Sequence, residues 1–480
     1  MKITDLINST DQKEIIEKLK KGRGEQPDVE AAKKALDPLQ HDVFDPVKRP
    51  DKKVRIDAED GGNKILEDPN AETGYRSEPV ARIAIALQKL IVKRAVAFLF
   101  GNEIELEAEP ENDKQKLILK ALKRMLYDSK SKSLNRKVAR QVMSCKEVAE
   151  LWYPVEKKHS NYGFDSNYQI RVAVFSPLLG DKLYPYFDKT GDMIAFSREF
   201  SQIDEEGNTK NFFETYTDVE HVLWQEGGAS GVEIAEGFPK KIEIGKIPVV
   251  FGTQLEFEWA DVQVLIDRLE KLLSNFGDTN DYHASPKIFV TGTIEGFAKK
   301  GESGAIIQGD ADSTAEYLAW QHAPESVKLE IETLLRLIYT LTQTPDISFE
   351  SIKGIGAVSG VALKLMFMDA HLKVEDHKEV FDEYMQRRLN ILKAFLSKFN
   401  TGLAADCEAL FVEPIITPYM IDDAKSLVDM LSTASGGKPV ISQKRAVELA
   451  GLANDTDAEF AQIEAEAAKD NSYLLGEPTE

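Results

Sequence analysis

The stretch EWADVQVLIDRLEKLLSNF, residues 258–276, gives the clearest structural signal in the chain. Its apolar side chains recur at spacings of four, three, four and three residues. This heptad-like pattern predicts a helix with one narrow apolar face, suited to packing nearly parallel to another helix. A second such helix is predicted to end at Pro345, because the residue before a proline avoids the helical region. The two apolar seams are Val262, Ile266, Leu269, Leu273 and Phe276, followed by Ile331, Leu334, Ile338 and Leu341.

Two glycine-containing stretches flank the second seam. Residues 285–326 contain a strand candidate, KIFVTGTI, and several glycines, so we expect an insertion between the two helices. Residues 347–360, ISFESIKGIGAVSG, form a predicted loop after the second helix. Beyond this loop, no glycine or proline occurs from 361 to 401, which permits one helix of roughly 60 Å at about 1.5 Å per residue.

Upstream of the first seam, a helical region precedes a β-rich one. Ser77 is the predicted N-cap of a helix that ends at Gly101, and further helices are predicted over 114–128 and 134–148. From about residue 150 to residue 253, short segments such as YQIRVAVFSP and NFFETYT alternate with turn residues. This alternation predicts an antiparallel sheet or meander. Together with the predicted helices, it indicates an α+β fold that is mainly α.

The two ends of the chain are polar. A short amphipathic helix is predicted near 11–21, followed by an extended arm to about residue 75. Towards the other end, a short strand candidate, EALFVEPIITP, precedes an acidic tail over 419–480 that is predicted to be helical.

Composition excludes several classes of protein. The formal net charge is −21, so a broad basic surface that grips nucleic acid through its phosphates is not expected. Cys145 and Cys407 lie far apart and form neither a disulfide framework nor a metal-binding pattern. Charged residues interrupt the most hydrophobic stretch, residues 79–101, so neither a membrane span nor a signal peptide is predicted.

Motifs for catalysis and cofactor binding do not fit. The glycines of GIGAVSG are misplaced for a dinucleotide fingerprint, and SGGKP at 435–439 lacks the spacing of a phosphate-binding loop. His371 and His377 are six residues apart on a predicted helix, which does not place them on one face as metal ligands. The acidic run 204–206 is expected to be a solvated turn. We therefore expect no enzyme, no cofactor and no metal.

The order of these elements resembles the portal proteins of long-tailed bacteriophages. The segment 260–292 is similar to that family's first stem helix, and DADSTAEYLAWQHAPESVKLEIETLLRLIYTLTQTPDIS, 310–348, is similar to its second. SGVALKLMF, 359–367, resembles the start of the helix after the tunnel loop, and 440–466 resembles the crown. The resemblance covers about 75–470 and leaves the N-terminal arm, 1–75, without a match. It implies a wing 76–255, first stem helix 256–284, clip 285–326, second stem helix 327–346, tunnel loop 347–360, long helix 361–400, wing strand 401–418 and crown 419–480.

What this resemblance implies is a closed ring of twelve identical subunits at one vertex of the capsid, made in the host cytoplasm and kept in the virion. Double-stranded DNA would pass through without sequence-specific contacts, and no membrane is involved. Further expected partners are the terminase large subunit, the head-completion or neck proteins, and the major capsid and scaffolding proteins. A different minor head or scaffold protein and a nucleotide-dependent DNA translocase remain as alternatives.

The resemblance also implies sites. The tunnel loop would face the DNA channel, and its glycines have the backbone freedom that a moving contact needs. A plain connector and solvated lysines remain possible there, as does an intramolecular bundle core for the stem seams. The residues expected at the loop are Lys353, Gly354, Gly356, Ser359, Gly360 and Lys364.

Overall fold

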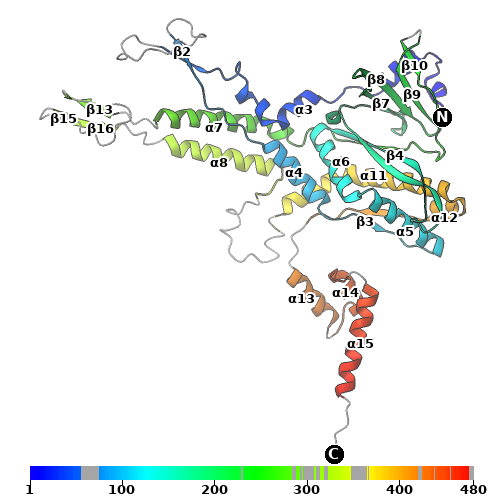
Figure 1. Ribbon diagram of the computed structural model, residues 1–480. Coiled ribbons are helices and arrows are strands. Elements are labelled where there is room, and N and C mark those ends of the chain that lie inside the picture. Colours follow the sequence, from blue (N-terminus) through cyan, green and yellow to red (C-terminus); the bar gives the residue numbers. More distant parts are fainter. Residues whose placement is uncertain are drawn as a thin grey trace, which may run out of the picture. The chain divides into compact units, whose positions relative to one another are not determined.

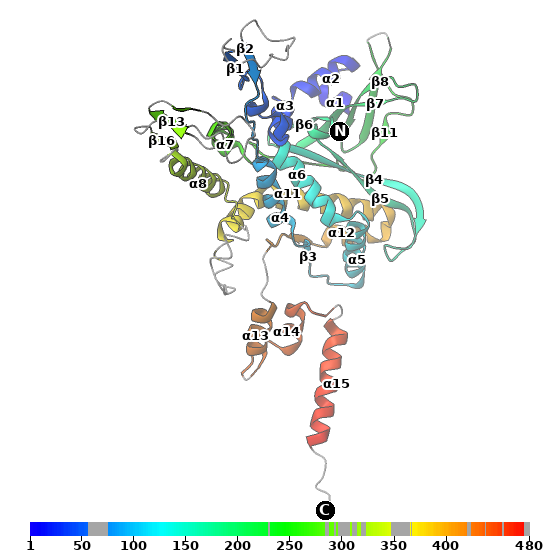
Figure 2. The same cartoon turned by 60° about the vertical axis from the view of Figure 1, so that its left-hand side comes forward.

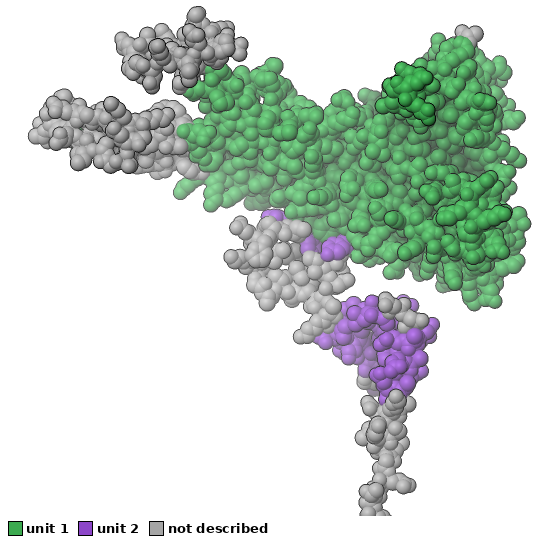
Figure 3. Space-filling model, in the orientation of Figure 1, with its two compact units in different colours: residues 1–345, 370–418 green, residues 346–369, 419–480 purple. Residues whose placement is uncertain are grey.

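A computed structural model describes most of the chain and divides it into two compact units. Unit 1 is Met1–Pro345 with Ala370–Pro418, and unit 2 is Asp346–Asp369 with Tyr419–Glu480 (Figure 3). Helices and antiparallel sheets occupy separate stretches, which confirms the α+β class. The described residues are 1–55, 75–228, 231–283, 288–291, 294–295, 308–309, 314–317, 323–346, 365, 367–419, 424–436, 438–453 and 456–474.

The N-terminal residues form helices rather than an extended arm. The helix predicted near 11–21 is confirmed as α2, Gln12–Lys21, and it follows the short α1, Ile3–Ile7. The prediction of an extended chain up to residue 75 is wrong, because α3, Val29–Leu36, lies within it. Asp28 caps α3 by accepting a hydrogen bond from the amide of Ala31 at 2.9 Å. A short hairpin follows, made of β1, Lys52–Arg55, and β2, Tyr75–Glu78.

Three further helices correspond to predicted ones, with differences at the start of the first and at both ends of the third. The helices are α4, Leu87–Phe100, α5, Asp113–Asp128, and α6, Ser131–Cys145. The predicted N-cap at Ser77 is wrong, because Ser77 lies in β2. Helix α6 ends before 148 because Lys146 adopts a left-handed conformation, φ 68°, and a buried strand begins immediately afterwards.

The β-rich region forms two antiparallel sheets, as predicted. One has the strand order β12-β4-β5, and the other is a meander ordered β10-β9-β8-β7-β6, with β11 paired to β9. The acidic run 204–206 is the turn between β7 and β8, in agreement with its prediction. The strands are β4 Glu147–His159, β5 Ser166–Phe175, β6 Lys182–Phe187, β7 Met193–Ile203, β8 Thr209–Tyr216, β9 Glu220–Glu226, β10 Val232–Ile234, β11 Lys240–Lys241 and β12 Val249–Thr253.

Two apolar clusters hold these layers together. In the first, α1 and α2 cover one face of the meander, where Ile15 and Leu19 pack with Phe213 and Trp224. In the second, the two sheets pack against each other. Gly252 in β12 allows the sheet to approach a helix closely, since a Cβ there would lie 2.8 Å from the ring of Tyr384.

The two seam helices lie side by side in unit 1 (Figures 1 and 2). They are α7, Gln263–His283, and α8, Ala323–Leu341. Between them, β13, Ile288–Thr291, pairs with β16, Thr314–Tyr317, and β14, Ile294–Glu295, pairs with β15, Gln308–Gly309. The single strand candidate KIFVTGTI is therefore divided between β13 and β14.

The remaining elements complete each unit. The long helix is α11, Met368–Phe399, which confirms a long helix after the loop but describes it only from 368. In unit 1 it is followed by α12, Ala404–Ala409, and β17, Glu413–Ile415, which pairs with β3, Glu105–Glu107. In unit 2 the tail forms α13, Ala424–Ser435, α14, Gln443–Ala450, and α15, Thr456–Leu474.

Within the described part of the chain, none of the helices has the length and apolarity needed to span a membrane. Over the same residues, there is no group of three or more acidic, histidine or cysteine side chains that could hold a metal ion.

Candidate functional site

The stem hairpin, α7 with α8, is the candidate site because both predicted seams lie on it. Val262 at the approach to α7 and Ile266 and Leu269 within it are fully buried. On α8, Ile338 is fully buried and Leu334 nearly so. An ion pair also links the two helices, with Arg268 Nη2 lying 2.6 Å from Glu330 Oε1. Much of each seam therefore packs inside a single chain.

The other seam residues are less buried. Leu273, Phe276 and Ile331 are half-buried. Leu341 is 54% exposed, so this side chain does not contribute to a core within the chain. Exposed leucines also occur elsewhere on α8, at Leu329 and Leu337. The hairpin thus has one apolar side that is buried in the chain and further apolar side chains that are open to solvent.

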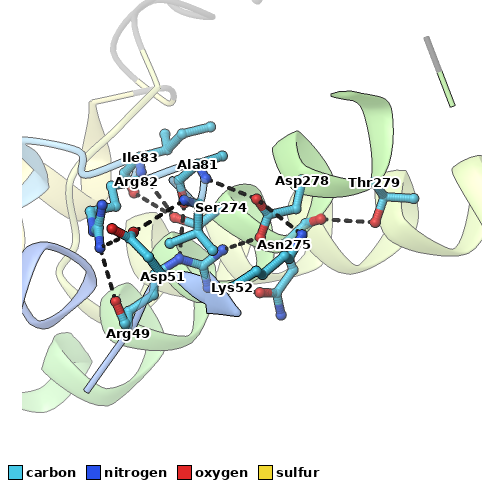
Figure 4. Close-up of polar contacts among 11 residues, drawn as sticks. Arg49, Asp51, Lys52, Ala81, Arg82, Ile83, Ser274, Asn275, Asp278 and Thr279 are labelled. Atoms are coloured by element: carbon cyan, nitrogen blue, oxygen red, sulfur yellow. Dashed lines mark hydrogen bonds and ion pairs between the residues drawn. The ribbon is translucent and has the colours of Figure 1, made fainter. Parts of the chain in front are cut away.

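An extended segment, residues 80–86, lies along α7 and is held by side chains of that helix (Figure 4). The amide of Ala81 donates to Asp278 Oδ1 at 2.8 Å, and the amide of Ile83 donates to Ser274 Oγ at 2.9 Å. The amide of Ile85 donates to Glu270 Oε1 at 2.9 Å.

The spacing of these contacts has a simple geometric basis. Alternate amides of an extended chain are about 6.6 Å apart, and one step of four residues along a helix rises about 6 Å. Residues 81, 83 and 85 can therefore match 278, 274 and 270 in turn. Because these amides are already satisfied, the segment does not join α4, whose first residue is Leu87.

Gly277 permits this close approach. A Cβ at this position would lie 2.9 Å from Cβ of Ala81, which is closer than real side chains come. The glycine in α7 thus has a packing role, at some cost in helix propensity.

Arg49 adds a second set of contacts to the same place (Figure 4). Its Nη2 lies 2.7 Å from Asp278 Oδ2, its Nη1 donates to Asn275 Oδ1 at 2.8 Å, and its Nε donates to the carbonyl oxygen of Ala81 at 2.9 Å. The Asp278 carboxylate is therefore shared by the extended segment and by the N-terminal region. Arg82 extends the network by donating to Asp51 Oδ1 at 2.7 Å.

His41 makes a second contact with α7 at Glu270, about two helical turns from Asp278. Its Nδ1 lies 2.7 Å from Glu270 Oε1, and its Nε2 lies 3.0 Å from the carbonyl oxygen of Ala35. Burial alone would lower the pKa of His41, but the hydrogen bond to Glu270 and the bond to Ala35 outweigh it and raise that pKa. Both neighbours are acceptors, which favours the ring with two N–H groups.

A polar cluster fixes the base of the stem where α8 ends and α11 begins. Lys373 Nζ lies 2.5 Å from Glu258 Oε1, and His377 Nε2 lies 3.1 Å from the same oxygen. Burial tends to raise the pKa of Glu258, but the bond from His377 and the charge of Lys373 outweigh it and lower that pKa. Arg94 on α4 donates to the carbonyl oxygen of Pro345 at 2.7 Å.

The predicted loop residues cannot be placed beside this cluster. Lys353, Gly354, Gly356, Ser359, Gly360 and Lys364 all lie outside the described residues. What the structure describes is the chain on both sides of the loop, up to Asp346 and again at 365 and from 367.

Sequence reasoning missed the polar contacts around the hairpin. Glu270, Ser274 and Asp278 recur every four residues between the seam positions, and this second stripe is a signal that the helix has a polar neighbour as well as an apolar one. The partners Arg49 and His41 give no such signal, because their contacts are with residues more than two hundred positions away.

The family described as phage portal protein, SPP1 Gp6-like, matches residues 55–473. The chain therefore belongs to this family of phage portal proteins, whose members are structural proteins of the phage particle. The contacts of His41 and Arg49 come from residues that precede the matched range.

Among solved structures, chains of gene transfer agent (GTA) particles are similar to this chain at low sequence identity. One is the neck of an empty GTA particle determined with C6 symmetry: identity 11%, TM-score 0.41, covering 76% of this chain and 89% of that chain. For the neck of a native GTA particle determined with C12 symmetry, the identity is 10% and the TM-score is 0.40, with 76% of this chain and 88% of that chain covered. For the virion of a native GTA particle, the identity is 11% and the TM-score is 0.39, with 76% of this chain and 88% of that chain covered. Among curated proteins there is no significant match.

Proposed function

We propose that this portal protein assembles into a closed ring at one vertex of a phage capsid, and that the stem hairpins of the ring surround a channel for double-stranded DNA. Membership of the portal family supports the role. The observation that supports ring assembly most directly is the set of exposed leucines on α8. Leu329 is 65% exposed, Leu337 is 40% exposed and Leu341 is 54% exposed in the single chain.

These leucines lie on one side of the helix. At about 100° per residue, the three fall within about 120° of one another around the axis of α8. A row of large apolar side chains on one side of a helix is typical of a surface that packs against another protein. When such a contact joins two different surfaces of identical subunits, repetition generates a closed ring if the rotation closes. We propose twelve subunits, the usual number in the family.

The charge of the chain supports passage of DNA rather than retention. A formal net charge of −21 disfavours broad contact with phosphates, so a duplex can move along the channel. Residues 347–360 are proposed to reach this channel, with Lys353 and Lys364 near the phosphates. On this proposal Gly356→Val leaves the ring intact and lowers the number of filled capsids. Normal filling would mean that the loop is only a connector.

The energy for DNA movement is proposed to come from a separate motor. The terminase large subunit would dock on the insertion 285–326 during packaging, and neck proteins would occupy it afterwards. Capsid and scaffolding proteins would contact the ring from the shell side. The purified protein should then hydrolyse no ATP, and an activity that disappears with Lys438→Ala would contradict this proposal.

The ring is tested with variants of α8. Leu337→Glu places a carboxylate among the exposed leucines and should reduce the ring to smaller species in native mass spectrometry. Lys328→Gln is the matched control, because it changes the net charge by the same amount on the opposite side of the helix, about 180° away. An intact ring for Leu337→Glu, or equal loss in both variants, would contradict the proposed interface. Circular dichroism melting checks that each variant is folded.

A further inference from the structure

In unit 1 the β12-β4-β5 sheet packs against the meander. At this contact, Ala149 and Phe175 of the first sheet contact Phe196 and Tyr216 of the meander. Beyond this cluster lies an open groove with a volume of about 700 Å³, between β4, β5, the segment 240–248 and the last turns of α11. We call it the aromatic groove. Its volume is in the range of sites that hold a ligand or a short peptide.

Aromatic side chains line this groove and remain partly exposed. Tyr153 is 36% exposed and Tyr168 is 39% exposed. The Tyr168 ring stacks on Phe399, which also lines the groove, at a centroid distance of 5.7 Å, so the two rings support each other. Rigid aromatic walls offer a large contact area at a small cost in side-chain entropy, which is characteristic of recognition surfaces.

The rim of the groove is basic. Lys240 and Lys241 lie on β11, Lys398 lies on the last turn of α11, and none of them forms an ion pair with any residue that the structure describes. Arg198 differs, since its guanidinium is already bound by Glu214 at 2.6 Å. Of the residues that line the groove, Glu243 is the only one with a carboxylate. Among the described residues these three lysines thus have no carboxylate partner, although Lys240 Nζ lies 4.5 Å from the centroid of the Phe238 ring.

We propose that the aromatic groove binds an extended, acidic segment of a protein partner, with aromatic or aliphatic side chains seated between the tyrosines. The basic rim is the reason for proposing an acidic partner segment. The aromatic walls are the reason for proposing that this segment also carries apolar side chains as anchors. A nucleic acid is a poorer match, because its phosphates continue beyond the groove, and a chain with a net charge of −21 disfavours such broad contact. A short acidic segment can end within the groove.

The proposal is tested with the full-length protein and a fluorescent peptide of alternating glutamate and tyrosine, by fluorescence anisotropy. Lys240→Glu/Lys241→Glu/Lys398→Glu should weaken binding about tenfold or more, and Tyr153→Ala/Tyr168→Ala should also weaken it. The matched control is Lys120→Glu/Lys132→Glu/Lys137→Glu, the same charge change at exposed lysines on α5 and α6. Melting curves identify variants that fail to fold.

Each outcome is decisive. Saturable binding that the groove variants lose and the control variant keeps would support the proposal. An equal loss of binding in the control variant would mean that binding depends only on the overall charge of the protein, which would overturn the proposal. Equally tight binding of a peptide of alternating glutamate and serine would show that the partner needs no aromatic side chains as anchors, which would contradict that part of the proposal. Tighter binding of an oligothymidine of similar length would overturn the assignment of a peptide. None of these results depends on whether the chain forms a ring.

Discussion

Lys373 donates from Nζ to the carbonyl oxygen of Thr342 at 2.8 Å. The same Nζ pairs with Glu258, so one side chain joins the end of α8, the approach to α7 and the first turns of α11. The chain thus leaves the stem and returns to it at a fixed point.

The first prediction concerns this contact. Lys373→Met keeps most of the side-chain volume and leaves Glu258 with His377 as its remaining partner. Because breaking a buried ion pair strands a charge, we expect a loss of about 3 kcal/mol in stability, concentrated at the stem base. Hydrogen exchange should rise in 338–344 and in 370–378.

The control for this experiment is Lys378→Met on the same helix. Lys378 pairs with Glu375 three residues away, and that carboxylate is 61% exposed, so its loss should cost less than about 1 kcal/mol. Equal effects of the two substitutions would mean that Lys373 is one more surface lysine and does not fix the base of the stem.

The second prediction concerns Asp278. Asp278→Ala removes the acceptor for the Ala81 amide and the partner of Arg49, so hydrogen exchange should increase in residues 80–86. Asp278→Asn retains an acceptor and should have a smaller effect. Asp281→Ala, one turn further along α7 and exposed, should leave exchange in that segment unchanged. We expect the largest increase in exchange for Asp278→Ala, a smaller increase for Asp278→Asn and none for Asp281→Ala. Any other order would contradict this prediction.

The seam helices could be predicted because their signal is local. The spacing of Val262, Ile266 and Leu269 specifies one apolar face whatever packs against it, and all three are buried. The sheet region was predicted for the same reason, since alternation and turn residues are read over a few positions. The spacing could not predict which seam residues are buried within the chain and which remain exposed, as Leu341 does.

The misplaced boundaries have non-local causes. The segment before Leu87 has the composition of a helix, but its amides bind the side chains of α7, about two hundred residues away. The helix predicted to run to 148 ends at Cys145, and strand β4 begins at Glu147 with the sequence EVAELW. In the structure Glu150 is fully buried, because Arg388 of α11 neutralises it.

The third prediction concerns pH and His41. The folded state raises the pKa of His41 above its ordinary value of about 6.5, because Glu270 and the Ala35 carbonyl accept from the ring and Asp267 lies nearby. The contact therefore stabilises the protein fully below about pH 6.5 and loses this contribution as the pH rises through the folded pKa. The melting temperature of wild type minus that of His41→Gln should be larger at mildly acidic than at mildly alkaline pH. A difference that does not change with pH would rule out the charged contact, and Glu270→Gln should flatten the wild-type dependence in the same way.

The last prediction concerns the buried pair of Arg388 and Glu150, which ties α11 to the first sheet. Arg388 Nε lies 2.6 Å from Glu150 Oε1 and Nη2 lies 2.8 Å from Oε2, and Glu150 also accepts from Trp152 Nε1 at 2.9 Å. Arg388→Met leaves this carboxylate buried without its cation, so the free energy of unfolding should fall by about 3–5 kcal/mol.

Adding Glu150→Gln to Arg388→Met should recover part of that loss, although glutamine alone is itself destabilising. The reason is that no uncompensated charge remains, while the amide oxygen can still accept from Trp152. A double-mutant cycle, followed by the apparent melting temperature and by urea unfolding, measures the coupling between the two positions. Arg387→Met is the control: among the described residues Arg387 pairs only with Glu383, on the exposed side of α11, and its loss should cost about 0.5 kcal/mol or less. Additive effects of the Arg388 and Glu150 substitutions would show that the pair does not act as a unit, and the attachment of α11 to the sheet would then depend on apolar packing around Leu389 and Leu392 instead.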